Sequence, residues 1–439
     1  MQLASLFALS GRPSARSSGR SSGRSGCLWF VSTVVALAVV VWSPVSSAQV
    51  AEFDTAQSVF YEAPTRTHMF VYSPSVDVQA SPTPWLDVRG GWEADVVSGA
   101  SVATKAGATY QATHPAADVV TTASVHDFRN LGRGEIALKG ETTSLTGGYA
   151  YSTEHDYQSN SMHVNARTDI LQHNTQFELS YARNFDSICD RVQGSTDTSP
   201  TRWIALETST GCFTGDPTRT THAIGIDTFE ASWGQSLSPV LESQVTYTGQ
   251  LIDGFQSDPY RSVVLGQGLK AQEHEPSERA REAVTARLAW YLRSIKAAVR
   301  LSLRGYYDTW AIESGTFEGE FEKWLGESVR VMARGRFYKQ TGAVFWSDDY
   351  TGGLPPLGPR GEYWTGDREL SPFWSWLAGV RFVWTVTPSN GRILGMMESF
   401  KLAGSSSMTG YTYEQYTLGG IPISNARSVL GTLSLSAVF

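Results

Sequence analysis

The last nine residues, GTLSLSAVF (Gly431–Phe439), alternate between apolar and small polar side chains and end on an aromatic ring. In a β-strand, neighbouring side chains point to opposite faces. Leu433, Leu435 and Ala437 therefore share one face, and the threonine and serines between them share the other. Such a strand is typical of a half-buried soluble sheet or of an outer-membrane barrel, apolar toward lipid and polar toward the lumen.

The same period of two recurs along most of the chain. It is clear in WLDVRGGWEADV (Trp85–Val96), where Leu86 and Trp92 alternate with Asp87 and Glu93. Comparable segments are LESQVTYTGQL (Leu241–Leu251), AVTARLAWYL (Ala283–Leu292), AAVRLSLRGYY (Ala297–Tyr307), VRVMARGRFY (Val329–Tyr338) and the run from Trp374 to Val386. Soluble strands usually have about five or six residues, whereas transmembrane strands need about ten. The lengths favour a membrane barrel.

One stretch, AIGIDTFEASW (Ala223–Trp233), changes the phase of its apolar residues. Ile224 and Ile226 are in one phase, and Phe229 and the residues after it are in the other. An extra residue in one strand would produce such a change. We expect a β-bulge near Asp227.

Short and long connections between the predicted strands alternate along the chain. Short turns are expected near Ser81, Leu171, Ser236, Arg293, Leu325 and Thr387. Longer connections are expected at residues 98–125, 188–219, 255–280, 347–369 and 405–424. Short turns at one end and long loops at the other are typical of bacterial outer-membrane barrels. A β-sandwich has no reason to sort its connections in this way.

The predicted fold class is all-β: a single transmembrane antiparallel up-and-down β-barrel over residues 49–439. Counting back from Phe439 gives about 14 strands from Trp85 onward. An N-terminal hairpin at residues 50–61 and 67–80 raises the number to about 16, the count we adopt, with 14 as the alternative.

The first 48 residues resemble a signal peptide. Met1–Gly26 carries four arginines and no acid, and Leu28–Trp42 is a run of about fifteen mostly apolar residues. Ser46 and Ala48 are small, as a cleavage site requires, so cleavage after Ala48 is expected. The alternative is an uncleaved N-terminal anchor. Phe439 is expected to be a C-terminal sorting signal that the barrel-assembly machinery reads. Together with the signal peptide, it predicts that the protein lies in the bacterial outer membrane and contacts its lipid. The chain could also form a homo-oligomer.

Charge and residue counts exclude several function classes. The chain has 35 basic and 42 acidic residues, which argues against nucleic acid as a partner. Cys27 leaves with the signal peptide, so Cys189 and Cys212 are expected to form a disulfide. The histidines occur singly, without metal-ligand spacing, and no cofactor motif is present. We therefore expect neither metal nor cofactor.

Charged residues on the inward faces are candidates for a pore lining. Basic ones are concentrated on what the sequence suggests are three neighbouring strands, and they are Arg287, Arg300, Arg304, Arg330, Arg334 and Arg336. Acidic ones fall on other strands and include Asp87, Glu93, Asp95, Glu135, Glu141, Glu154 and Asp156. Such segregation predicts a transverse field across a pore. The alternative is a structural network of ion pairs that fills and stiffens the lumen.

Seven segments, in order along the chain, together resemble one family. They are DVVSGASV (95–102), STEHDYQS (152–159), SDPYR (257–261), EHEPSERAR (273–281), YYDTWAIESGT (306–316), RFYKQTGAVFW (336–346) and YWTGDRELSPF (363–373). They are similar to an uncharacterised family of bacterial outer-membrane barrels, domain of unknown function three-five-seven-zero. The resemblance implies one full-length barrel and no catalytic residues. Lys339, Gly342 and Glu369 depart from the expected pattern.

Most of these motifs fall at predicted extracellular strand ends. Arg261 and Arg279 would lie on one long loop, and Asp308 would end the nearest strand pair. We expect these residues to form a constriction or ligand mouth, or else an anchor that holds the upper end of the barrel together.

From these observations we expect a passive, porin-like channel for small solutes or ions, and not an enzyme. A non-conducting receptor or scaffold for a periplasmic or surface partner is the alternative. A hydrolase at the barrel rim is third, because the adjacent His155 and Asp156 would face opposite sides of a strand.

Overall fold

The computed structural model describes residues 50–63, 69–99, 125–154, 156–192, 213, 219–257, 262–265, 269–347, 362–388, 391–415, 417–418, 421–422 and 425–439. Sixteen antiparallel strands close into one barrel, as predicted. They are β1 (Val50–Ala63), β2 (Met69–Thr83), β3 (Leu86–Gly99), β4 (Val125–Lys139), β5 (Thr143–Thr153), β6 (Tyr157–Ile170), β7 (Thr175–Val192), β8 (Arg219–Ser238), β9 (Leu241–Gly254), β12 (Glu278–Leu292), β13 (Ala297–Asp308), β14 (Glu313–Leu325), β15 (Val329–Gln340), β16 (Phe373–Val386), β17 (Ser399–Tyr413) and β20 (Asn425–Val438).

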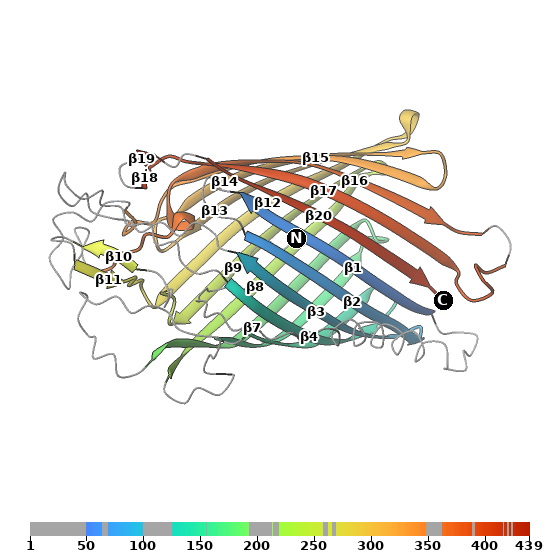
Figure 1. Cartoon of the computed structure of the whole chain (residues 1–439). Coiled ribbons are helices and arrows are strands. Elements are labelled where there is room, and N and C mark those ends of the chain that lie inside the picture. The colour runs from blue at the N-terminus through green and yellow to red at the C-terminus, as the bar shows by residue number, and fades with distance from the viewer. Residues whose placement is uncertain are drawn as a thin grey trace, which may run out of the picture.

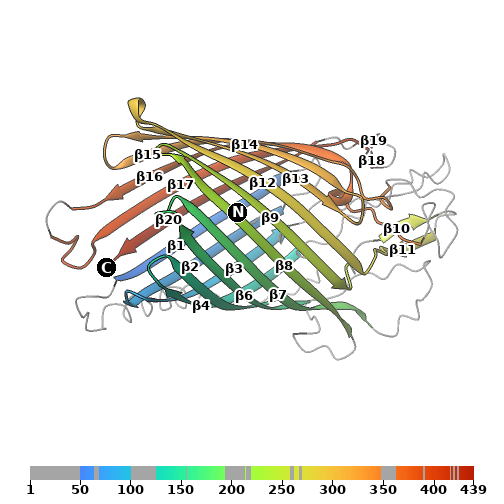
Figure 2. The ribbon, with the colours of Figure 1, turned by 180° about the vertical axis from the view of Figure 1, so that it is seen from behind.

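Closure depends on the two terminal strands. β1 pairs with β2 on one side and with β20 on the other, with Phe53 opposite Ala437. The predicted N-terminal hairpin is therefore β1 and β2, and it raises the count from 14 to 16. The wall is continuous around the barrel in both views (Figures 1 and 2). A closed barrel satisfies backbone hydrogen bonds between its strands and leaves no open edge.

The two ends of the barrel differ, and we name them by their connections. At the turn end lie the C-terminus and tight connections such as η3 (Arg293–Ile295), which ends on Lys296 in the left-handed region with φ of 50°. At the loop end lie two short ribbons, β10 (Ser262–Leu265) with β11 (Leu269–Gln272) and β18 (Thr417–Leu418) with β19 (Ile421–Pro422). Figure 1 shows both ribbons at the end opposite the C-terminus.

The strands separate an apolar outer face from a polar inner face. Exposed outward side chains on the central strands include Leu288, Leu303, Phe317, Phe337 and Val380. The residues between them are the arginines, glutamates, serines and threonines of the inner face. On β20, Leu433 is exposed on the outer face, whereas Thr432 and Ser436 bond to Ser58 and Glu52 of β1. The alternation in the C-terminal nonapeptide thus separates an apolar outer face, of the kind that contacts lipid, from a polar face toward the lumen.

The β-bulge predicted near Asp227 is absent, because the register of β8 with both neighbours is continuous through that residue. The phase changes for another reason. Ile224 turns inward and packs in the lumen against Ile188 and Ile252 near the loop end, whereas Phe229 faces outward. The apolar residues exchange faces without an inserted residue.

Asp227 itself faces outward, where both of its carboxylate oxygens accept hydrogen bonds from Arg183 at 2.9 and 2.7 Å. Tyr181 also donates to this carboxylate, at 2.6 Å. A charge on the outer face of a membrane barrel is costly without such a partner.

A second correction concerns the connection predicted at residues 405–424. β17 continues to Tyr413, so that connection begins about nine residues later than the sequence indicated. The run of small residues Ser405, Ser406 and Ser407 weakens the period of two in this strand. Within the described part of the chain, no helix combines the length and apolarity needed to cross a membrane.

Candidate functional site

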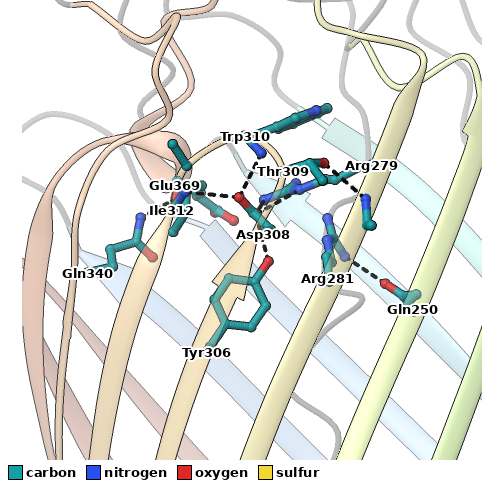
Figure 3. Close-up of polar contacts among 12 residues, drawn as sticks. Gln250, Arg279, Arg281, Tyr306, Asp308, Thr309, Trp310, Ile312, Gln340 and Glu369 are labelled. Carbon is teal, nitrogen blue, oxygen red and sulfur yellow. Dashed lines mark hydrogen bonds and ion pairs between the residues drawn. The ribbon is translucent and has the colours of Figure 1, made fainter.

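Asp308 is the centre of a polar cluster inside the loop end of the barrel (Figure 3). It ends β13 and is fully buried. One carboxylate oxygen, Oδ2, accepts hydrogen bonds from Nε of Arg279 at 2.9 Å and from the hydroxyl of Tyr306 at 2.7 Å. The other, Oδ1, accepts from the backbone N–H groups of Trp310 and Ile312 at 3.0 and 2.9 Å. Asp308 therefore fixes the β13–β14 turn and holds β12 beside it.

Arg279, at the start of β12, is held by more than its ion pair. Its guanidinium lies over the Trp310 ring, 4.0 Å from the centroid, and its side chain is only 8% exposed. The indole N–H of Trp310 donates to the carbonyl of Glu278 at 3.1 Å. Cation–π contact and charge-assisted hydrogen bonds together lock the guanidinium in place. These contacts favour the predicted anchor over a constriction or ligand mouth.

The connection between β15 and β16 folds into the same end of the lumen. Nε2 of Gln340 donates to the carbonyls of Glu369 and Ser371 at 2.7 and 2.8 Å. Beside them, η4 (Arg368–Leu370) is capped by Asp367, whose side chain accepts from the N–H of Glu369. We call the described residues 362–372 of this connection the mouth segment.

The mouth segment reaches two distant parts of the barrel. Arg368 donates to both carboxylate oxygens of Glu62 at the end of β1, at 2.6 and 3.1 Å. On the other side, Trp364 forms a β-bridge with His274, and Glu273 accepts from the N–H of Gly366. Since His274 precedes β12, the segment spans the half of the wall that runs from β12 to β1.

An apolar cluster holds this arrangement together. It contains Trp310, Ile312, Ala343, Phe345, Trp346, Leu370, Tyr413 and Ala426, with Tyr306, Tyr363, Phe373 and Tyr411 packed against it. Burial by itself lowers the pKa of the Arg368 guanidinium, but Tyr413 and the Glu62 carboxylate outweigh it and raise that pKa. Arg368 therefore stays a cation inside an otherwise apolar cluster, neutralised by Glu62.

The predicted segregation of basic residues is wrong in one respect. The inward arginines lie on β12, β13 and β15, and β14 runs between the last two. β14 carries an inward row of glutamates: Glu318, Glu320 and Glu322. Arg334 bonds to Glu318 at 2.6 Å, and Arg300 and Arg330 each lie 3.3 Å from Glu322. We call these residues the β14 ladder, and it neutralises half of the predicted basic surface.

A second ladder lies across the lumen on β2, β3 and β4. Arg133 donates to both oxygens of Asp77 at 2.7 and 2.6 Å, and Arg129 bonds to Asp95 at 2.7 Å and to Glu93 at 2.9 Å. Asp87 is paired with Lys139. The predicted acids Asp87, Glu93 and Asp95 of β3 are thus also compensated, by bases on the neighbouring strand β4.

Other predicted site residues lie elsewhere. Arg287, Arg304 and Arg336 point inward and form no ion pair with another described residue. Glu154 and Asp156 lie at the loop-end connection of β5 and β6, and Asp156 is fully buried.

Several predicted residues lie outside the described part of the chain. They are Arg261, His155, Cys212 and residues 1–48, whereas Cys189 is described and fully buried. The disulfide and the signal peptide remain predictions.

Sequence reasoning missed several members of the site. The glutamates of β14 alternate with Phe317 and Phe321, so the period of two could have placed them on the inner face. The contacts of Glu62 with Arg368 and of Asp77 with Arg133 join distant parts of the chain, and no local pattern carries that information. Among the described residues, no group of three or more potential metal ligands comes together.

This geometry defines the class of protein: a closed 16-strand membrane-type β-barrel with a charged lumen and a packed loop end. The chain belongs to the family described as "Protein of unknown function (DUF3570)", whose model matches residues 33–422. A comparison with curated proteins found no match.

Solved barrels resemble the fold at low identity. A bacterial polysaccharide outer membrane secretin is 8% identical, with 90% of this chain and 99% of that chain covered and a TM-score of 0.45. OccK2 (OpdF) of Pseudomonas aeruginosa, solved with glucuronate, is 8% identical, with 89% and 98% covered and a TM-score of 0.40. CdiB from Acinetobacter baumannii is 8% identical, with 88% and 60% covered and a TM-score of 0.43.

Proposed function

We propose that this protein is a passive, non-enzymatic channel of the outer membrane for small polar solutes or ions. The observation that carries the proposal is the solvent exposure of inward charged side chains. Arg89, Arg167 and Arg300 point into the lumen, and their side chains are 50, 49 and 44% exposed. Side chains of a solid core would be buried, so this exposure supports a lumen that contains water. Barrels of about 16 strands are wide enough for an aqueous channel.

The proposed orientation places the turn end in the periplasm and the loop end outside the cell, as in other bacterial barrels. Residues 1–48 would direct export, and Phe439 would be read by the barrel-assembly machinery. The apolar outer face would contact lipid. In this orientation, a solute from outside first meets the mouth segment, which narrows the loop end and restricts passage to small molecules.

A second candidate is a receptor or scaffold that does not conduct. The packed cluster around Trp310 and Leu370 favours it, because the same contacts that narrow the loop end could also close it. In that case the loops would serve as a binding surface for a partner, and the lumen ladders would only stiffen the barrel.

Planar-bilayer recording of the purified, detergent-refolded protein separates the two candidates. Stable stepwise currents in potassium chloride are expected for the channel. Silence from protein that shows strand circular dichroism and heat-modifiable migration would contradict the channel and leave the scaffold. A variant that weakens the mouth segment, Arg368→Ala, should raise the step size of the channel, because the segment loses its contact with β1.

A further inference from the structure

A cavity of about 300 Å³ lies in the inner wall toward the turn end, away from the mouth segment. Six adjacent strands line it, from β15 through β16, β17, β20 and β1 to β2. Figure 1 shows β17, β20 and β1 side by side near the C-terminus. Cavities of this size hold small ligands.

One wall of the cavity is acidic. β1 contributes Glu52 and Asp54, and β2 contributes Asp77. Asp77 is already satisfied by Arg133, which donates to both of its oxygens. Glu52 accepts one long hydrogen bond, from Oγ of Ser436 at 3.3 Å. Within the described chain, Asp54 has neither an ion pair nor a hydrogen bond from a side chain. Two carboxylates therefore face the cavity with little compensation.

The opposite wall is basic. It carries Arg330, Arg381 and Lys401. Arg330 bonds to Glu322 of the β14 ladder at 3.3 Å. Arg381 and Lys401, in contrast, form no ion pair with any other described residue. The inward Arg287, Arg304 and Arg336 also lack an ion pair within the described chain, but only Arg381 and Lys401 among these five cations line the same cavity as two weakly compensated acids.

The register shows why the walls do not neutralise each other. Asp54 is opposite Ser436 of β20, and Ser436 is opposite Lys401 of β17. One strand thus separates acid from base, which places their backbones about 10 Å apart. β20 fills the interval with Ser434 and Ser436, and Ala56 and Ala403 are also small. The short side chains leave the space open and put hydroxyl groups at its floor.

We propose that this cavity binds small zwitterions, such as amino acids, with the ammonium group at Glu52 and Asp54 and the carboxylate at Arg381 and Lys401. Two walls of opposite charge select a ligand that carries both charges, because a singly charged ligand satisfies only one wall. The proposal deepens the proposed function, on which its transport role rests: a solute passing the lumen would pause at this site.

Binding to the detergent-solubilised protein is measured by calorimetry with four probes that share a four-carbon chain: γ-aminobutyrate, butyrate, butylamine and butanol. γ-Aminobutyrate should bind about tenfold more tightly than butyrate or butylamine, since it gains a second solvated ion pair. In the double variant Glu52→Gln with Asp54→Asn, the affinity for γ-aminobutyrate should fall to that of butyrate for the wild-type protein. In the double variant Arg381→Gln with Lys401→Gln, the affinity for γ-aminobutyrate should fall to that of butylamine for the wild-type protein.

The control variants remove the same charges from the far wall. Glu230→Gln with Glu242→Gln and Arg287→Gln with Arg304→Gln should leave the affinity unchanged. Asp54→Asn alone, a milder change, should weaken binding of γ-aminobutyrate about threefold. Equal affinities for γ-aminobutyrate and butyrate, or an unaltered affinity in both cavity variants, would overturn the proposal. Conductance is measured on the same preparation: silence there contradicts the channel, whereas calorimetry decides the site independently.

Discussion

Glu62 and Arg368 are 306 residues apart in the chain, yet they form an ion pair with two hydrogen bonds inside the loop end of the barrel. Their side chains are only 4 and 14% exposed. Through this pair, the connection between β15 and β16 contacts β1. In the barrel wall, β17 and β20 lie between β16 and β1. The ion pair thus links the mouth segment to one of the two terminal strands that close the barrel.

Glu62→Gln should therefore loosen the mouth segment and lower stability. Removing one partner of a buried ion pair costs about 3 kcal/mol, because the other charge stays buried without compensation. We expect a lower midpoint of thermal unfolding in detergent and larger, noisier single-channel steps. Arg392→Ala, which breaks an exposed ion pair with Glu398 at the turn end, is the control and should change neither quantity. A stable Glu62→Gln variant with wild-type conductance would show that the pair does not position the segment.

Asp308→Asn tests whether the cluster at β12 and β13 is an anchor. The substitution keeps the shape but leaves Arg279 without a counterion, and an unfolding cost of about 3 kcal/mol is expected. Conductance of the folded fraction should change little, because Arg279 is held against Trp310 and does not line an open path. Adding Arg279→Gln should recover part of the lost stability. Altered ion selectivity with unchanged stability would instead assign these residues to a constriction.

The β14 ladder predicts the charge preference of the channel. Glu318→Gln, Glu320→Gln and Glu322→Gln together would leave Arg300, Arg330 and Arg334 uncompensated on the lumen wall. The reversal potential in a potassium chloride gradient should then shift toward anion preference. Arg300→Gln with Arg334→Gln should shift it toward cations. No shift in either variant would mean that ions do not pass this wall.

Phe439 is predicted to act in biogenesis and not in the folded barrel. Its backbone N–H donates to the carbonyl of Ala51 at 2.9 Å, a contact that any residue could make. Phe439→Ala should therefore reduce the amount of heat-modifiable protein in outer-membrane fractions several-fold, while the protein refolded in detergent unfolds at the wild-type temperature. Thr432→Ala, an inward change on the same strand, is the control for yield. Normal yield of Phe439→Ala would exclude the sorting role.

Much of the fold could be predicted because period-two alternation is a local property of each strand. The alternation of Leu301 and Leu303 with Arg300 and Ser302, for example, places each side chain on its face without knowledge of the neighbours. The prediction of a β-bulge at Asp227 was wrong because it, too, relied on this local pattern alone. Ile224 is apolar because it packs on Ile188 and Ile252 across the inner face, and a local pattern cannot distinguish that packing from a lipid contact.

The site was less predictable because its chemistry depends on pairing. Arg279 and Asp308 could be brought together from their places at neighbouring strand ends, but the observations that favour an anchor over a constriction, the Trp310 contact and the burial, come only from the structure. Likewise, the charges of Arg300, Arg330 and Arg334 have meaning only once β14 is placed between β13 and β15.

The central claim is that the inner face of the closed barrel lines a water-filled path. Cysteine accessibility during bilayer recording tests it most directly, with Ser302→Cys pointing inward and Leu303→Cys pointing outward on the same strand. A membrane-impermeant, positively charged methanethiosulfonate reagent should reduce the current through Ser302→Cys and leave Leu303→Cys and the wild-type protein unchanged. Equal modification of both variants, or a Ser302→Cys variant that conducts no current, would contradict the account.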